Sequence, residues 1–330
     1  MLLIVTILLF VFIVGLCVGS FLNVVVLRAL SNESIVFPAS KCPKCQHALL
    51  WWHNIPILSF ILLKGKCGFC GDRISVQYPI VELVTGIMFV LVTLKFGVLS
   101  WDTLFGWIIG SLFIVLATTD WKEKVVFDMH TYALIGVGLF YAILITGIDM
   151  YQYYSLMGEF NFSTQWLVGN HISLALLGII LGFVGMEIIS RIGYLIAGSR
   201  AFGEGDSFIA AGLGAVFGWK ILLTILVLSV AIQVVITLPI FIKKEIEQKN
   251  WMTVISLGAF ILYTGAFFMA QQFGWLANTV AYVASAIVLA ILGLLTCREI
   301  LTNINTAPEN RTYLPFGPAL VLAGFIILLF

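Results

Sequence analysis

The chain opens with MLLIVTILLFVFIVGLCVGSFLNVVVL (residues 1–27), a stretch without a single charged residue. A membrane-spanning helix needs about 20 apolar residues, and a backbone in lipid must satisfy its own hydrogen bonds, so this stretch predicts a transmembrane helix. The apolar region of a secretory signal peptide is only about 7–15 residues long and follows basic residues. Because this stretch is longer and no Lys or Arg precedes it, we expect a first span that the protein retains.

The same apolar character extends along the whole chain. Apolar residues make up 61% of the sequence and charged residues only 10%, against about 25% charged residues in soluble domains. The mean hydropathy is +1.10, and the net charge of +1 does not favour a nucleic-acid partner. We predict an all-α polytopic protein of the lipid bilayer, with further spans near 77–97, 101–120, 128–148, 168–198, 206–219, 220–242, 251–271, 275–296 and 314–330.

The positions of the basic residues predict the orientation of these spans. Cytoplasmic loops of membrane proteins carry an excess of Lys and Arg. With the N-terminus outside, only Lys95 and Lys220 of the 17 Lys and Arg residues fall on the outer side. The long polar segment 28–77 is then cytoplasmic, and so are both ends of 243–311.

The cytoplasmic segment 28–77 contains four of the six cysteines. Two CxxC pairs separated by about 20 residues match the spacing of a zinc ribbon. Four thiolates fill the tetrahedral shell of Zn²⁺ and leave no position for a substrate, so we expect a structural metal. The four ligands that we predict are Cys42, Cys45, Cys67 and Cys70.

Residues within and between the cysteine pairs refine this prediction. Gly68 and Gly71 allow the backbone angles that tight metal-binding turns need. The alternatives are four unconnected free thiols, or a zinc ligand supplied by His47 or His53. A segment of about fifty residues buries little core, so its stability should come largely from the metal. Residues 51–56 (Trp-Trp-His-Asn-Ile-Pro) are expected to form a small core and a membrane-facing surface.

Ionisable residues at membrane depth mark candidate functional sites, because they are costly to place there. The sequence has few of them: Glu82, Asp120, Asp128, Glu187 with Arg191, and Asp206. Glu187 and Arg191 are four residues apart on one expected helix, and we favour a structural ion pair for them.

Asp120 and Asp206 form a candidate catalytic pair. Asp120 ends the third expected span and Asp206 begins the sixth, within Gly203-Glu204-Gly205-Asp206, so the topology brings both to the cytoplasmic face. Two neighbouring carboxyl groups in a poorly solvated site share one proton: the ionised group activates water, and the protonated group donates to a peptide carbonyl. The alternatives are helix-end residues in water, an ion relay in a transporter, and a pair in which the first acid is Asp128.

Together these motifs resemble the type IV prepilin peptidase family of GxGD-type membrane aspartyl proteases. The matching segments, in family order, are 19–28, the two cysteine pairs with 54–59 between them, 74–82, Asp120, 203–206 and 315–318. The resemblance implies that Asp120 and Asp206 are the catalytic aspartates and that Gly203 and Gly205 belong to the active-site loop. Asp128 and Glu82 are candidate supporting residues.

The resemblance also implies an activity and a location. Family members are multi-pass enzymes of the bacterial plasma membrane that cleave the leader of prepilins and pilin-like proteins after a glycine. Members with the four-cysteine domain also N-methylate the new N-terminus with S-adenosylmethionine, for which the sequence shows no separate site. A peptidase without methylation is the alternative.

The chain departs from the family pattern in places. Phe127 stands where a proline commonly precedes Asp128, Ala29-Leu30 stand where a proline commonly follows Arg28, and 243–311 adds two spans. The predicted division is a first transmembrane helix at 1–27, the cytoplasmic zinc-binding domain at 28–77, a catalytic core at 78–242, an extra hairpin at 243–311 and a last helix at 312–330.

Overall fold

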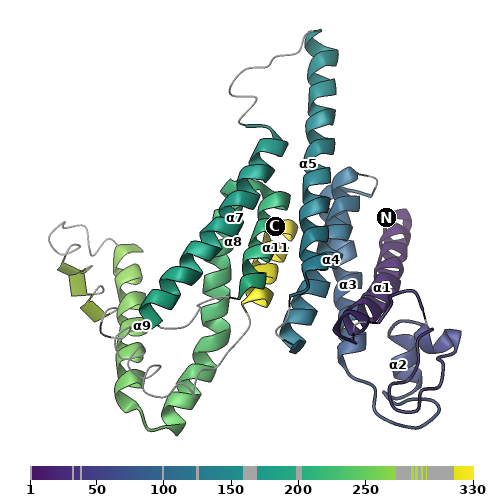
Figure 1. The fold of residues 1–330 in the computed structure, drawn as a ribbon, viewed down its shortest axis with the longest axis horizontal. Helices are drawn as coiled ribbons and strands as arrows, with labels where there is room; N and C mark the ends of the chain where they lie inside the picture. Colours follow the sequence, from purple (N-terminus) through teal and green to yellow (C-terminus); the bar gives the residue numbers. More distant parts are fainter. Residues whose placement is uncertain are drawn as a thin grey trace. The chain divides into compact units, whose positions relative to one another are not determined.

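The computed structural model is helical (Figure 1), and it describes residues 2–31, 33–37, 39–98, 100–123, 126–158, 169–197, 203–272, 284–285, 287–288, 291–292, 295 and 316–330. Within these residues there are two isolated β-bridges and no strand. Six of the described helices, α1, α3, α4, α5, α7 and α8, are long and apolar enough to cross a membrane. The predicted fold class, an all-α polytopic membrane protein, is therefore confirmed.

The helices follow the apolar stretches of the sequence, because only a helix pairs every backbone group within one segment in lipid. In chain order they are α1 (Leu2–Ser31), the 3₁₀-helix η1 (Trp51–Asn54), α2 (Leu58–Leu62), α3 (Gln77–Phe96), α4 (Trp101–Glu123), α5 (Asp128–Met157), α7 (His171–Ala197), α8 (Glu204–Glu247), α9 (Trp251–Gln272) and α11 (Gly317–Leu329).

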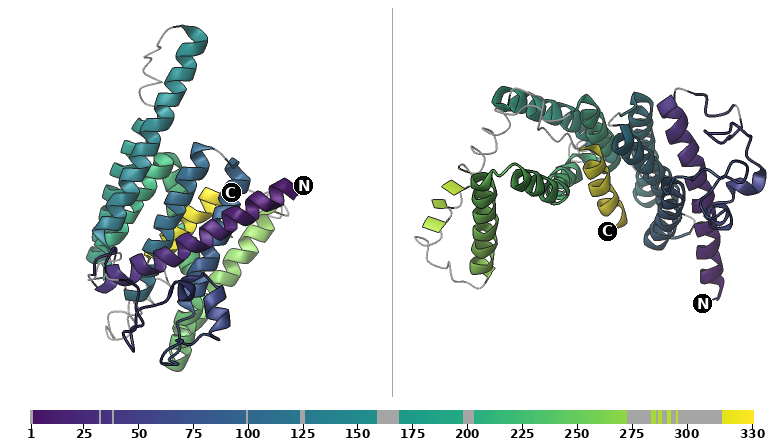
Figure 2. Two further views of the ribbon diagram at one scale, coloured as in Figure 1. Left: turned by 90° about the vertical axis from the view of Figure 1, so that its right-hand side faces the viewer. Right: turned by 90° about the horizontal axis from the view of Figure 1, so that it is seen from below.

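The chain forms two compact units. The first contains residues 1–190, 202–231 and 315–330, and the second contains 191–201 and 232–314. In the first unit, α4 packs against α1, α3, α5 and α11 (Figures 1 and 2). Its side chains Phe113 and Leu116 are fully buried, as are Leu134 of α5 and Leu320 of α11. The helix that carries Asp120 is thus the centre of this unit.

Close helix contacts in the first unit depend on small residues. Between α1 and α3, a Cβ added at Gly19 would lie 2.7 Å from the Cα of Glu82. Between α7 and α8, the backbones of Gly178 and Gly214 touch, so a Cβ on either would overlap the carbonyl of the other. Small residues at such crossings supply the close van der Waals packing that holds helices together in lipid. These contacts fix the helices on which Glu82 and Asp206 lie.

The long helix α8 is interrupted at Gly218, whose φ of 73° and ψ of 166° are not helical. A straight helix of its 44 residues would be about 66 Å long, roughly twice the thickness of the hydrocarbon core of a bilayer. The interruption separates 204–217 from 219–247, at the boundary expected between the sixth and seventh spans. A glycine suits this position because its φ lies in the left-handed region.

Some helix ends differ from the sequence prediction. The first helix continues beyond Leu27 to Ser31, and within it Arg28 is buried and donates to the carbonyl oxygen of Ser34 at 2.7 Å. The last helix begins at Gly317 rather than near 314, with Pro318 in its first turn, where a missing N–H costs nothing. The second span expected in the extra hairpin, 275–296, lies largely outside the described residues.

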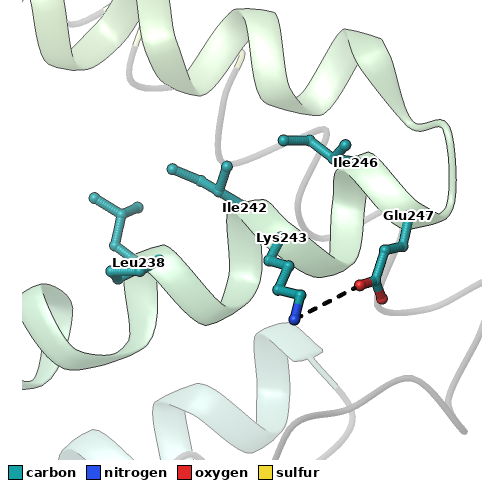
Figure 3. A pocket seen from close by; sticks show the side chains of 6 residues that line it. Leu238, Ile242, Lys243, Ile246 and Glu247 are labelled. Carbon is teal, nitrogen blue, oxygen red and sulfur yellow. Dashed lines mark ion pairs between the residues drawn. The ribbon is translucent and has the colours of Figure 1, made fainter.

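In the second unit, a pocket of about 560 Å³ follows the last turns of α8 (Figure 3). Lys243 and Glu247 form an ion pair of 4.0 Å beside it, and an exposed pair of this kind contributes little stability. All the lining residues come from this one helix, and none is a candidate site residue: Leu238, Pro239, Ile242, Lys243, Ile246 and Glu247.

The cysteine-containing insert between α1 and α3 is built from η1, α2 and two short loops. The bridges Lys41↔Ala48 and Lys66↔Arg73 each close a loop around one cysteine pair. The rings of Trp52 and Phe69 both contact the ring of His53, at centroid distances of 3.9 and 5.4 Å. Trp51 is 80% exposed. The insert therefore has a small ring cluster and an outward-facing tryptophan.

Candidate functional site

The four paired cysteines come together in the insert. The sulfur atoms of Cys42, Cys45, Cys67 and Cys70 all lie within 4.8 Å of one another, and those of Cys42 and Cys70 are 4.0 Å apart. Four thiolates bound to zinc at about 2.3 Å would lie about 3.8 Å apart. The cluster therefore has the composition and the size of a tetrahedral metal shell, and it can hold a metal ion.

Similar turns shape the two cysteine pairs. The N–H groups of Gln46 and Gly71 each donate to the carbonyl of the first cysteine of their pair, at 2.9 Å. Both residues have a left-handed backbone, with φ of 58° and 73°, so the prediction for Gly71 is confirmed. Gly68 does not have a positive φ, and that part of the prediction is wrong. A Cβ at Gly68 would instead come within 3.2 Å of His53 Nε2, so glycine makes room for the ring.

Neither histidine of the insert belongs to the group of described residues that could bind the metal, which consists of the four cysteines. The ring of His47 stacks on Phe69 at a centroid distance of 4.9 Å. His53 accepts a hydrogen bond from the backbone N–H of Leu50 through Nδ1, at 3.3 Å. Both rings thus serve the small core of the insert, and the geometry favours the four thiols as the ligand set.

The pKa values of the two thiols in the second pair are driven apart. The backbone N–H groups of Cys70 and Phe69 lower the pKa of Cys67 to about 6. The N–H of Asp72 lowers the pKa of Cys70, but burial and the other three thiols outweigh it and raise that pKa to about 11. Neighbouring thiolates repel one another, so a cation is needed to keep all four deprotonated.

Asp120 and Asp206 lie together inside the first unit. Asp120 is near the end of α4 and Asp206 is in the first turn of α8, and they are only 4% and 6% exposed. The two carboxyl groups are close enough to interact electrostatically. Asp206 Oδ2 accepts a hydrogen bond from the backbone N–H of Gly203 at 3.1 Å, which fixes its orientation. Two buried acids with fixed geometry can act as a proton-sharing pair.

Two glycines bring backbone close to this pair of carboxyl groups. A Cβ at Gly317, the first residue of α11, would overlap Asp120 Oδ2. The N–H of Gly317 faces the same carboxyl group, but Oδ2 has no hydrogen bond of regular geometry to a described residue. A Cβ at Gly205 would lie 2.5 Å from the Cβ of Val126, in the segment that precedes α5. The site is therefore built from α4, α8, α11 and the start of α5.

The other predicted acids are not members of the buried carboxyl pair. Asp128 is exposed at the start of α5. Glu82 is buried in α3 and accepts a hydrogen bond from the N–H of Ile57 at 2.7 Å, so it links the bundle to the insert. Glu187 accepts a hydrogen bond from the hydroxyl of Ser207, the residue next to Asp206, at 3.2 Å. The structure thus pairs Asp206 with Asp120 rather than with Asp128.

Two details of the site, and one buried histidine in α5, were not predicted from the sequence. The bond from Ser207 to Glu187 and the contact of Gly317 with Asp120 join segments that are distant along the chain. His130 in α5 is buried, and neither of its ring nitrogens has a hydrogen-bond partner among the described residues. The only sequence signal for His130 was its position inside an apolar stretch. Its lack of a described partner is unusual, because buried polar groups normally have partners.

Two family models match this chain, one over the first helices with the insert and one over the helices that carry Asp120 and Asp206. The family described as "Bacterial Peptidase A24 N-terminal domain" matches residues 13–96, and the "Type IV leader peptidase family" matches residues 107–238. The first match contains the insert and Glu82, and the second contains Asp120 and Asp206. Residues 243–311 lie outside both. No solved structure gives a significant match.

Several curated relatives are named prepilin leader peptidase/N-methyltransferase. A protein of Myxococcus xanthus is 34% identical over 67% of this chain, and the match covers 59% of that relative. A protein of Neisseria gonorrhoeae is 32% identical over 70% of this chain and 82% of the relative. A protein of Klebsiella pneumoniae is 32% identical over 67% of this chain and 89% of the relative.

The fold and the site define a multi-pass helical membrane protein with a buried pair of carboxyl groups at the ends of two spans and a four-cysteine cluster in an insert. The matches then assign the family. The chain belongs to the type IV leader peptidase family.

Proposed function

We propose that this protein is an aspartic endopeptidase that removes the leader of prepilins and pilin-like proteins after a glycine, with Asp120 and Asp206 as its catalytic pair. The observation that carries the proposal is the burial of these two carboxyl groups within range of electrostatic interaction, on helices matched by the family. The names of the relatives support the substrate class. A transporter with an ion relay is not supported by these relatives.

The chemistry needs only the two carboxyl groups and a water molecule. One carboxylate takes a proton from the water as the oxygen attacks the scissile carbonyl, and the protonated partner donates to that carbonyl oxygen. The N–H of Gly203 holds Asp206 in place. The N–H of Gly317 faces the carboxyl group of Asp120. Burial strengthens these interactions by excluding bulk solvent.

The four-cysteine cluster is proposed to bind Zn²⁺ as a structural ion. Four sulfur ligands close the metal shell, so the ion holds the insert together and takes no part in peptide cleavage. The excess of Lys and Arg supports a cytoplasmic insert and an N-terminus outside the bacterial plasma membrane. The catalytic pair then faces the cytoplasmic side, where α4 ends and α8 begins.

We also propose that the enzyme N-methylates the new N-terminus, as the second half of the relatives' names suggests. When bound, S-adenosylmethionine would supply the methyl group that the new amine accepts. This chain must bind the cofactor and hold that amine beside it.

The test is an incubation of purified, zinc-loaded enzyme with a prepilin and S-adenosylmethionine, followed by the intact mass of the product. The expected product lacks the leader and carries one added methyl group. An uncut prepilin would overturn the peptidase, and a cut but unmethylated product would overturn the methyltransferase.

A further inference from the structure

A second cavity lies where the membrane bundle meets the insert. It has a volume of about 260 Å³ and is lined by Cys17, Ser20, Phe21, Val24, Ser40, Asn54 and Pro56. The first four of these residues follow the i, i+3, i+4, i+7 spacing of one face of α1. The other three belong to the insert, on both sides of the first cysteine pair. One wall is therefore a membrane helix, and the other is the segment that the metal organises.

Hydrogen bonds fasten the two walls to each other. The buried carboxyl group of Glu82 accepts a bond from the N–H of Ile57, next to Pro56 in the insert, and a bond from the hydroxyl of Ser20 in α1. A second buried side chain, Asn23, donates to the carbonyl oxygen of Tyr78 at 3.1 Å and ties α1 to α3. The cavity thus has a defined shape only while the insert is folded against the bundle.

The chemistry of the lining fits a nucleoside. The ring of Phe21 offers a stacking surface for a purine base, because offset stacking of aromatic rings is favourable. The side-chain amide of Asn54 can both donate and accept, which matches the edge of adenine. The hydroxyl of Ser40 can donate to or accept from a ribose hydroxyl, and that of Ser20, which donates to Glu82, can accept from one.

The charge and size of the cavity narrow the choice of ligand. None of its seven lining residues is basic, which argues against a nucleotide phosphate or a phospholipid head group, since phosphates are bound by Arg, Lys or helix N-termini. The volume is a little below the roughly 300 Å³ at which pockets for drug-sized ligands begin. A nucleoside without phosphate fits, with any longer substituent reaching out of the cavity.

We infer that this cavity binds the adenosyl part of S-adenosylmethionine. The inference rests on the methyltransferase half of the proposed function and names its cofactor site. It predicts that methylation depends on a structural metal that touches neither reactant, because the metal would organise the insert wall that contains Ser40, Asn54 and Pro56. Cleavage at Asp120 and Asp206 does not use this wall.

The test uses tritiated S-adenosylmethionine with the full-length, zinc-loaded protein in nanodiscs. Equilibrium binding is measured, and ultraviolet crosslinking then maps the label. We expect crosslinked peptides from 13–28 or 39–57, and competition by unlabelled S-adenosylhomocysteine. Asn54→Ala and Phe21→Ala should each weaken binding about tenfold or more, as the loss of a good polar or stacking contact implies. Zinc content and prepilin cleavage should stay unchanged, which shows that the variants are folded.

Matched controls separate the site from general effects. Asn250→Ala removes an amide in the second unit, and Ser31→Ala removes an exposed hydroxyl of α1 as a control for Ser20→Ala; neither control should change binding. Wild-type binding that survives Asn54→Ala, Phe21→Ala and Ser20→Ala, or label found elsewhere, would overturn the site and leave the methyltransferase intact. Zinc-loaded enzyme that cleaves prepilin but binds no cofactor would overturn the methyltransferase and the site together.

Discussion

The buried pair of carboxyl groups and the cysteine cluster are both assembled from distant residues, but different forces hold them. Asp120 and Asp206 are almost completely buried on long helices that pack through glycines. The cysteines lie in an insert where Cys42 is the one buried residue among the described residues of 33–76. Packing fixes the first site, whereas the second has little buried surface and should depend on the metal that we propose. A substitution that disrupts one site should therefore leave the structure of the other intact.

Among the variants that leave both carboxyl groups in place, the largest effect on cleavage is expected for Gly317→Ala. The added Cβ would overlap Asp120 Oδ2, and a displacement of about 1 Å at a reacting group can lower the rate by about 100-fold. Prepilin cleavage should fall by that amount, with zinc content unchanged. Gly147→Ala is the control, because its Cβ would meet nothing within 4 Å. Wild-type cleavage by Gly317→Ala would show that Asp120 is not held as described.

A smaller effect on cleavage is expected for Cys67→Ser. The protein should lose the roughly one zinc ion per chain that we predict, and the insert should exchange its amide hydrogens faster, because metal binding supplies its folding energy. Methylation should be lost, while cleavage should fall by less than about tenfold, since packing holds the dyad. Metal analysis, hydrogen exchange and the two assays measure this, with Cys297→Ser as the control. Equal loss of both activities would mean that the sites are not independent.

The smallest effect is expected for deletion of 243–311. This segment lies outside the residues matched by the family, and none of the residues described around Asp120 and Asp206 comes from it. The deletion variant should retain measurable prepilin cleavage in detergent even if its melting temperature falls. Size-exclusion chromatography and zinc content establish that it is folded. A monodisperse, zinc-loaded variant without any cleavage would instead give this segment a place in the substrate path.

The sequence predicted what depends on local pattern. Apolar stretches predicted the helices, the two CxxC pairs predicted the cluster, and alternation of loops predicted that Asp120 and Asp206 share one face. The sequence could not predict the overlap of Gly317 with Asp120, since it joins residues far apart and depends on helix rotation. The sequence also predicted that Gly68 is needed for the backbone angles of a tight turn. In the structure Gly68 has no positive φ, and its missing side chain makes space for His53.

The hydrogen-bond partner of the Glu82 carboxyl group could not be predicted from the sequence either. A buried acid in an apolar stretch marked it as a candidate supporting residue, but its bond to the N–H of Ile57 depends on how the insert folds back against α3. Likewise, the cavity lined by α1 and the insert combines residues that no spacing rule connects. The periodicity of the sequence indicates which face of a helix is buried. Which residues that face contacts depends on how the helices pack in three dimensions.

The most direct test of the central claim compares three substitutions that each replace one acid by an amide. Asp120→Asn and Asp206→Asn should each lower prepilin cleavage by about 10²–10⁴-fold or more, because an amide cannot share or accept the proton. Asp128→Asn should retain measurable cleavage, since this acid is exposed at the start of α5. All three should insert in the membrane and bind zinc equally. An inactive Asp128→Asn together with an active Asp120→Asn would contradict the account.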